Sequence, residues 1–205
     1  MTKKLYLMRH GQTRFNVQKR IQGASDSPLT ELGIEQAKMA RIFFENQGIK
    51  FNRIYSSTQE RACDTAEIVS GRTDYIRLKG LKEWDFGAFE AQSEYLNPPL
   101  DLEHIGQAYG DYFVTYGGEG ARQVRQRMMR TVGEIISQAA EGETILAVTH
   151  GAAISQYFRE ALAVYPDNLT TPNCSIFNFV FDGDKVSMPL VYDPINDKIL
   201  YKEEN

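Results

Sequence analysis

Residues 5–16 read LYLMRHGQTRFN, the most informative stretch of this chain. An apolar run stops at Arg9 and His10, and a glycine and several polar residues follow. A short apolar run of this kind is typical of a buried strand, which here ends at Arg9. His10 is one of three histidines in the chain. It is therefore either a reactive group at a sheet edge or an ordinary histidine that ends a strand.

Apolar periodicity predicts alternating helices and strands along the rest of the chain. Helices are expected at residues 31–48, 58–69, 124–139 and 151–162. Strands are expected at residues 53–57, 75–78, 144–149, 175–181, 185–192 and 199–203, with a hairpin turn at 182–184. This alternation predicts an α/β fold, a three-layer α/β/α sandwich with a mostly parallel central sheet. Residues 1–205 are expected to form a single domain with an inserted cap-like segment at about 91–120, where prolines and glycines interrupt any long element.

The composition is that of an ordinary globular protein, with 42% hydrophobic and 24% charged residues. The net charge of −4 argues against nucleic acid or a membrane surface as a partner. No apolar run is long enough for a membrane span or a secretory signal. Cys63 and Cys174 lie far apart without a CxxC motif and are expected to be reduced. These features predict a cytoplasmic protein.

Three predicted strands end near residues that suit an anion, because ligands of open α/β sheets bind beyond the carboxyl ends of the strands. Two of these ends carry the same dipeptide, His-Gly, at residues 10–11 and 150–151. Arg61 lies one turn into the helix after the third end, so its side chain can reach the same edge. Arg9, Arg61 and the first N–H groups of the two following helices attract anions. The expected guest of such a pocket is phosphate.

Each of these residues also has a purely structural interpretation. Taken alone, His10 or His150 is more typical of a buried histidine whose hydrogen bonds are satisfied than of a catalytic residue. Taken alone, Arg61 is more typical of a solvent-exposed helix residue. Glu83, in the stretch LKEWDF, is equally typical of a surface carboxylate, and His104 has no partner pattern. The shared placement at strand ends favours a functional cluster.

Neither a metal nor a nucleotide cofactor is expected. Zinc and iron favour paired ligands such as HxxxH or HxH, which the chain lacks, and the arginines beside the histidines repel a cation. The glycine-rich GGEG at residues 117–120 lacks the Lys-Ser/Thr pair of a P-loop.

Six segments in this order resemble the histidine phosphatase superfamily, in the branch that contains cofactor-dependent phosphoglycerate mutases and their small phosphatase relatives. The segments are LYLMRHGQTRFN, QGASDSPLTELGIEQA, YSSTQERACDTAEIV, LKEWDFGAFE, GGEG and AVTHGAAI, and the resemblance covers about residues 4–180. RHG alone is a weak signal, whereas the ordered set is highly specific. The family usually has GGES, so Gly120 lacks a hydroxyl, and this departure concerns only peripheral substrate contacts.

The resemblance implies a reaction through a phosphohistidine. His10 is the expected nucleophile, and Glu83 is the expected general acid for the leaving oxygen. Arg9, Arg61 and a protonated His150 are expected to hold the phosphoryl oxygens. Further substrate contacts are expected at Asn16, Gln22, Gly23, Thr13 and Gly151.

On this basis we expect a metal-independent phosphatase that hydrolyses small phosphate monoesters, so its partner is a small phosphorylated metabolite. Mutases of this branch are longer, with a larger insertion that keeps water from the phosphoenzyme. A cofactor-dependent phosphoglycerate mutase is the alternative, and a non-catalytic binder of phosphorylated ligands is the third. The substrate stays open, and a homodimer is compatible with the sequence although no stretch specifies one.

The insertion is rich in aromatic residues, which either form a lid over the pocket or pack the insertion onto the core. They are Tyr95, Tyr109, Tyr112, Phe113 and Tyr116. Packing is the favoured interpretation, and the lid is the alternative.

Overall fold

The fold is built around one seven-stranded sheet, described in a computed structural model over residues 2–98, 109–166 and 168–203. The strands are β1 (Lys3–Arg9), β2 (Arg53–Ser57), β3 (Ile76–Leu78), β4 (Thr144–Thr149), β5 (Ile176–Asp182), β6 (Lys185–Asp193) and β7 (Lys198–Lys202). They lie side by side in the order β3-β2-β4-β1-β5-β6-β7. β1 is the central strand, so the residues that follow it emerge at the middle of the sheet edge.

The sheet is mixed, so the expectation of a mostly parallel sheet was wrong. β1, β2, β3 and β4 run parallel, whereas β5 is antiparallel to β1, and β6 and β7 are each antiparallel to the strand before them. The turns at residues 183–184 and 194–197 are too short for the crossover that a parallel pair needs, and they leave only antiparallel pairing. The predicted hairpin turn at residues 182–184 is confirmed.

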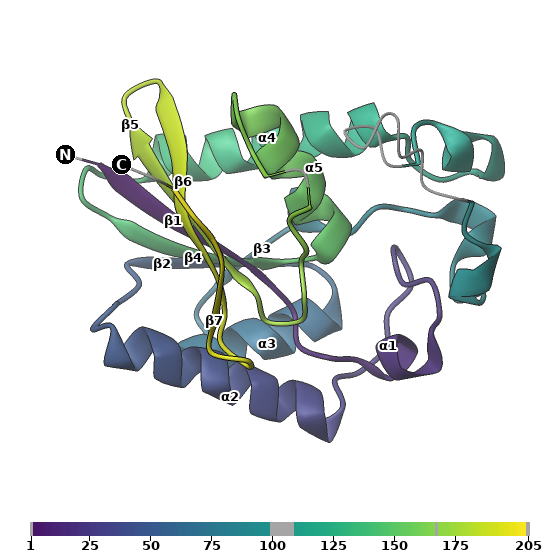
Figure 1. The fold of residues 1–205 in the computed structure, drawn as a ribbon, viewed down its shortest axis with the longest axis horizontal. Coiled ribbons are helices and arrows are strands. Elements are labelled where there is room, and N and C mark those ends of the chain that lie inside the picture. Colours follow the sequence, from purple (N-terminus) through teal and green to yellow (C-terminus); the bar gives the residue numbers. More distant parts are fainter. Residues whose placement is uncertain (1, 99–108, 167, 204–205) are drawn as a thin grey trace.

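Helices cover both faces of the sheet and give the expected three layers (Figure 1). α2 (Glu31–Asn46) and α3 (Glu60–Ser70) lie on one face, and α4 (Ala121–Gln138) and α5 (Gly151–Ala161) lie on the other. The apolar spacing in the sequence correctly predicted their buried residues, which include Ala37, Ala40, Phe44, Ala62, Ala66, Val69, Val124, Met128, Val132 and Ile135. Both cysteines are buried and free. Within the described residues, no helix has the length and apolar character needed to cross a membrane.

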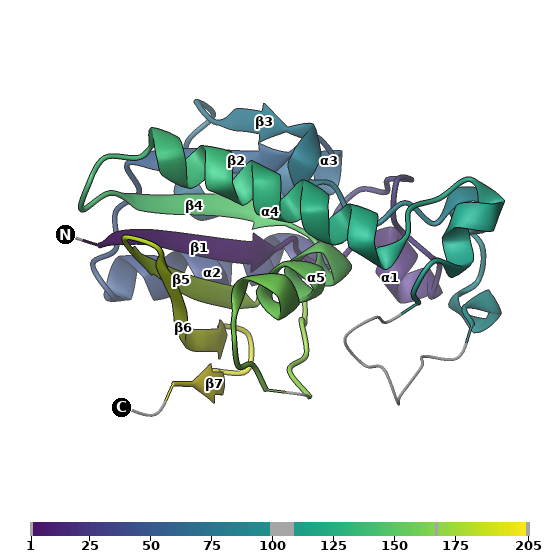
Figure 2. The same cartoon turned by 90° about the horizontal axis from the view of Figure 1, so that it is seen from above.

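The segment between β3 and α4 lies beyond the carboxyl ends of the parallel strands, near the short helix α1 (Arg14–Gln18), as Figure 2 shows from above. Its described part contains only short 3-10 helices, η1 (Lys79–Leu81), η2 (Gly87–Phe89), η3 (Glu94–Leu96) and η5 (Tyr112–Tyr116). Residues 99–108, which include His104, lie outside the described residues.

The aromatic residues of the insertion do not behave as one group. Phe113 is fully buried, with its ring edge-on to those of Phe86 and Phe89. Tyr109 also packs against Phe113, whereas Tyr95 is 84% exposed. Packing onto the core therefore describes some of these rings, and solvent exposure describes others.

Candidate active site

Three strand ends bring the two predicted histidines and Arg61 together. β1 and β4 run parallel with Arg9 opposite Thr149, and the N–H of His10 donates to the Thr149 carbonyl oxygen at 3.1 Å. His10 and His150 therefore follow at the same sheet edge, and their ring centroids are 5.1 Å apart. β2 also ends here and leads into α3, so Arg61 reaches both rings from the first turn of that helix.

His10 is buried and neutral, and one ring nitrogen is left for chemistry. Its Nδ1 lies 2.7 Å from the Gly11 carbonyl oxygen, which is an acceptor, so Nδ1 carries the proton. Nε2 is the unprotonated nitrogen, and Nε of Arg61 donates to it at 3.3 Å. Burial lowers the pKa of His10 well below 6.5, and the charges of Arg61 and Arg9 lower it further. The neutral ring keeps the lone pair that a nucleophile needs.

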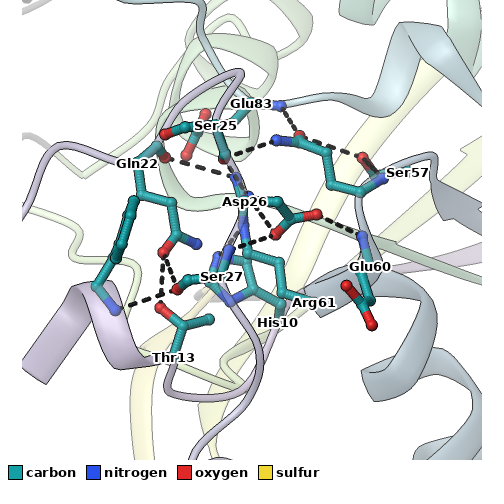
Figure 3. Close-up of polar contacts among 12 residues, drawn as sticks. His10, Thr13, Gln22, Ser25, Asp26, Ser27, Ser57, Glu60, Arg61 and Glu83 are labelled. Carbon is teal, nitrogen blue, oxygen red and sulfur yellow. Dashed lines mark hydrogen bonds and ion pairs between the residues drawn. The ribbon is translucent and has the colours of Figure 1, made fainter. Parts of the chain in front are cut away.

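Arg61 is fully buried and links the histidine pair to a neighbouring loop. Its Nε lies 3.3 Å from His10 Nε2 and 3.2 Å from His150 Nδ1. Its Nη1 donates at 2.8 Å to both the Ser25 carbonyl and the Asp26 carboxylate (Figure 3). Burial lowers the pKa of Arg61, but the adjacent Asp26 charge opposes that shift. The Nη groups are thus engaged by the loop, and Nε is the donor directed at the histidines.

His150 is neutral in this structure, which contradicts the expectation of a protonated ring. Its Nδ1 accepts from Nε of Arg61 and therefore carries no proton. Burial lowers the pKa of His150 well below 6.5, and the charges of Arg61 and His10 lower it further. The proton is then on Nε2, which is buried without a hydrogen-bond partner among the described residues. A buried N–H without an acceptor favours an anionic ligand at that point.

Two carboxylates of the chain occupy the helix N-termini that were expected to attract phosphate. Glu83 is 8% exposed, and its two oxygens accept from the N–H groups of Ala153 and Ala152, at 2.8 and 3.0 Å, in the first turn of α5. Asp26 accepts from the N–H of Glu60 at the start of α3 (Figure 3). That expectation was wrong, because a helix N-terminus binds a nearby carboxylate for the same reason that it binds phosphate.

A pocket of about 200 Å³ opens at this edge of the sheet. Its lining residues are Arg9, Asn16, Arg20, Ile21, Gln22, Glu83, Phe86, Glu94, Asn97, Tyr109 and Ala152. Nε of Arg9 and Nε2 of Gln22 are buried without a partner among the described residues. The pocket lining thus contains two residues with unsatisfied N–H donors, which suit an oxyanion. In the described part of the chain, no group of three or more His, Cys, Asp or Glu side chains is placed to hold a metal ion.

Of the expected site residues, Arg9, Glu83, Asn16 and Gln22 line this pocket, whereas the buried His10, Arg61 and His150 are not among its lining residues. Three further residues expected to contact the substrate do not line it either. Thr13 caps α1 and donates its hydroxyl hydrogen to Gln22 Oε1 at 2.8 Å. Gly23 packs so closely on the adjacent loop that a side chain there would collide with backbone. Gly151 begins α5. These three residues are therefore not pocket-lining residues, whereas Asn16 and Gln22 line the pocket.

An ion pair that the sequence did not reveal braces the Glu83 loop from behind. Arg127, on α4, donates to the carbonyl oxygens of Gly80, Lys82 and Glu83 at 2.9, 2.7 and 3.2 Å. The carboxylate of Glu119 accepts from the same guanidinium at 2.9 and 2.7 Å. Glu119 was visible within GGEG, but no sequence pattern pairs Arg127 with a distant loop.

Glu90 fixes the loop that engages Arg61. Its carboxylate accepts from the N–H groups of Gly23, Ala24 and Ser25 at 3.1, 2.7 and 2.9 Å, and from the Ser25 hydroxyl at 2.6 Å. The sequence marked Glu90 only as the end of the motif FGAFE, without a role. Its contacts show that this motif supports the site from outside the pocket.

The chain belongs to the histidine phosphatase superfamily (branch 1), because the model of that family matches residues 5–194. The family expected from the ordered motifs is therefore confirmed. Its members include proteins described as phosphatases and proteins described as phosphoglycerate mutases, so membership indicates an enzyme that acts on phosphate groups.

Individual relatives fall on both sides of that division. A protein of Proteus mirabilis (strain HI4320), described as probable phosphoglycerate mutase GpmB, is 45% identical over 180 residues, covering 84% of this chain and 82% of the relative. The crystal structure of a phosphoglycerate mutase from Bacillus anthracis str. Sterne has a TM-score of 0.79 at 26% identity, covering 91% of both chains. A phosphoserine phosphatase from Entamoeba histolytica, solved with phosphoserine, has a TM-score of 0.71 at 26% identity, covering 92% of this chain and 96% of the other.

Proposed function

We propose that the protein is a metal-independent phosphatase that hydrolyses small phosphate monoesters through a phosphohistidine on His10. The observation that carries this proposal is the orientation of the His10 ring. Its Nδ1 is held by the Gly11 carbonyl oxygen, which leaves the Nε2 lone pair directed toward Arg61 beside His150. A pocket at the same edge of the sheet is lined by Arg9 and Gln22, which carry N–H donors without a partner among the described residues, and by Glu83.

In the first step, His10 Nε2 attacks phosphorus while the ester P–O bond breaks. Glu83, which lines the pocket, enters this step protonated and gives its proton to the leaving oxygen, and the water of the second step restores that proton. Arg9, Nε of Arg61 and the Nε2 proton of His150 hold the non-bridging oxygens, where negative charge is spread in the transition state. The neutral alcohol then leaves, and the phosphoryl group remains on Nε2.

In the second step, a water oxygen attacks the phosphorus of the phosphohistidine, and the Glu83 carboxylate takes a proton from that water. The P–N bond breaks, its electron pair returns to His10 Nε2, and inorganic phosphate leaves. Two backbone N–H groups of α5 and one of Trp84 hold the Glu83 carboxylate in place for this step. Glu83 thus serves first as acid and then as base.

A phosphoglycerate mutase is the second candidate, because the relatives from P. mirabilis and B. anthracis carry that name. A mutase must hold a phosphorylated three-carbon acid while the phosphoryl group returns to a different oxygen. The wall of this pocket carries Glu94 as well as Arg20, so it disfavours the additional anionic group of a bisphosphate intermediate. This charge balance favours hydrolysis of monophosphates.

The two candidates are separated by one set of assays on the purified protein with a chelator present. Hydrolysis predicts release of inorganic phosphate from p-nitrophenyl phosphate without a priming bisphosphate. Interconversion of 2- and 3-phosphoglycerate that depends on bisphosphoglycerate, with little phosphate release, would instead assign the protein as a mutase. Binding of phosphorylated ligands without turnover would overturn both, and loss of activity in the chelator would overturn metal independence.

A further inference from the structure

The outer part of the pocket is formed by two short segments that pair with each other. Arg20 forms an antiparallel bridge with Ser93, and the N–H of Glu94 donates to the Lys19 carbonyl oxygen at 2.9 Å. Both Arg20 and Glu94 line the pocket. The pairing therefore places a cation and an anion on the same wall, away from the histidines.

The charge of Glu94 acts inside the pocket. It works against the effect of burial on the pKa of Arg9, and it adds to burial in raising the pKa of Tyr109, another lining residue. A carboxylate in a phosphate-binding pocket repels the phosphate, and it favours a ligand whose remaining part carries a positive charge.

A second acceptor lies beside Glu94. Asn97 lines the pocket, and its Oδ1 is buried without a hydrogen-bond partner among the described residues. The N–H of Asn97 donates to the Glu94 carbonyl oxygen at 3.1 Å, so the two side chains start from one turn. An unsatisfied buried acceptor next to a carboxylate suits an ammonium group, which carries three donors and no acceptor.

We propose that this outer part of the pocket selects O-phosphorylated amino acids, with the substrate ammonium bound by Glu94 and Asn97 Oδ1. Arg20 lies on the same wall and pairs with the substrate carboxylate. The proposal rests on the function proposed above, because the phosphate of the same molecule must reach His10. It adds the substrate class and names Glu94 as the residue that determines it.

Phosphoserine and 3-phosphoglycerate provide a matched test, because they share the carbon skeleton, the carboxylate and the phosphate. They differ at one position, where an ammonium replaces a hydroxyl. The quantity to measure is the ratio of kcat/KM for phosphoserine to kcat/KM for 3-phosphoglycerate, by phosphate release. We expect a ratio of about 10 or more in the unaltered protein, the size of one well-placed charged contact.

Glu94→Gln keeps the shape of the side chain and removes its charge. We expect it to lower kcat/KM for phosphoserine and raise it for 3-phosphoglycerate, so that the ratio falls about tenfold, mainly through KM. Arg20→Met is expected to weaken both substrates alike and leave their ratio unchanged, because both carry the carboxylate. Glu35→Gln, at an exposed glutamate on α2, is the matched control and should leave both rates unchanged.

A ratio of one or less in the unaltered protein, or an unchanged ratio in Glu94→Gln, would overturn the selection of an ammonium group. In either case, continued hydrolysis of p-nitrophenyl phosphate, which has no amine, would leave the proposed phosphatase function intact. Absence of hydrolysis of every ester would overturn the proposed function itself. If Glu94 only balances the charge of Arg9 and Arg20, its removal raises both rates equally, and this outcome also contradicts the proposal.

Discussion

The inner and outer ends of the pocket are built in different ways. At the inner end, His10, Arg61 and His150 follow strand ends or begin helices, and they are 3%, 0% and 0% exposed. At the outer end, Arg20 and Glu94 are exposed and lie on short paired segments away from the sheet. The core fixes the groups that react, whereas a few backbone contacts fix the groups proposed to choose the substrate.

Charge also acts differently at the two ends. Water and salt screen exposed charges, while the buried Arg61 is screened much less. Changes at the inner end should therefore affect every substrate strongly. Changes at the outer end should redistribute activity among substrates, as in the Glu94 test above.

The largest effect is expected from His10→Ala, which removes the attacking atom at the inner end. Hydrolysis of p-nitrophenyl phosphate should fall by roughly four orders of magnitude or more, by analogy with other lost nucleophiles. Acid-labile labelling of the protein by substrate phosphate should disappear after a rapid quench. Labelling that persists in this variant would place the nucleophile on another residue.

Glu83→Gln is expected to have the next largest effect, and one that depends on the leaving group. A poor leaving group such as glycerol needs the proton, so its phosphate ester should slow by about 10²–10⁴-fold. p-Nitrophenolate leaves without help, so its ester should slow least. Equal slowing of both esters would argue against an acid role for Glu83.

Variants of the Arg127–Glu119 ion pair test whether its contacts with the Glu83 loop affect catalysis by Glu83. Arg127→Met should leave the three loop carbonyls without their donor and slow glycerol phosphate by about tenfold, the size of one lost charged contact. p-Nitrophenyl phosphate should slow less, whereas simple loss of folded protein would reduce both esters equally. Arg127→Lys should recover part of the loss, and adding Glu119→Gln to Arg127→Met should add little, because the pair acts as a unit.

The smallest expected effect is a pH dependence of the free energy of unfolding, which the two buried neutral histidines cause. Burial, reinforced by Arg61, holds the pKa of His10 and of His150 well below 6.5, while in the unfolded chain both regain ordinary values. Below about pH 6.5 the unfolded state therefore binds more protons, and the free energy of unfolding falls as the pH falls. The slope is at most about 1.4 kcal/mol per pH unit for each histidine.

Urea unfolding between pH 7.5 and 5 measures that slope. His150→Gln should reduce it, whereas Arg20→Met, at the outer end, should leave it unchanged. A slope that is identical in His150→Gln and the unaltered protein would show that this histidine is not buried in its neutral form.

The sequence predicted the residues of the inner end of the pocket better than those of the outer end. Strand ends and apolar spacing located His10, His150 and Arg61 at one edge, because neighbouring parallel strands must end together. The same reasoning overestimated the parallel part of the sheet, although it found the hairpin that makes β5 and β6 antiparallel. It also expected phosphate at helix ends that Glu83 and Asp26 occupy.

The outer end was beyond the reach of sequence patterns for a physical reason. Arg20, Glu94 and Asn97 lie on segments without periodicity, so nothing in their spacing indicates which side chains share a wall. Arg127 lies on a correctly predicted helix, but its contacts with the Glu83 loop depend on tertiary packing. The expected protonated His150 also failed, because burial beside Arg61 outweighs any local sequence signal.

The antiparallel pairing of Arg20 with Ser93 has a consequence for how specificity can be exchanged between relatives. A graft of residues 91–97 alone would leave residues 19–20 facing a foreign segment, whose backbone need not follow the path that the bridge and the hydrogen bond from the N–H of residue 94 to the Lys19 carbonyl oxygen require. A graft that moves both segments keeps their pairing and leaves the strand ends untouched. The proposed substrate choice thus depends on two paired segments, and chimeras should transfer it only when both segments come from the same parent.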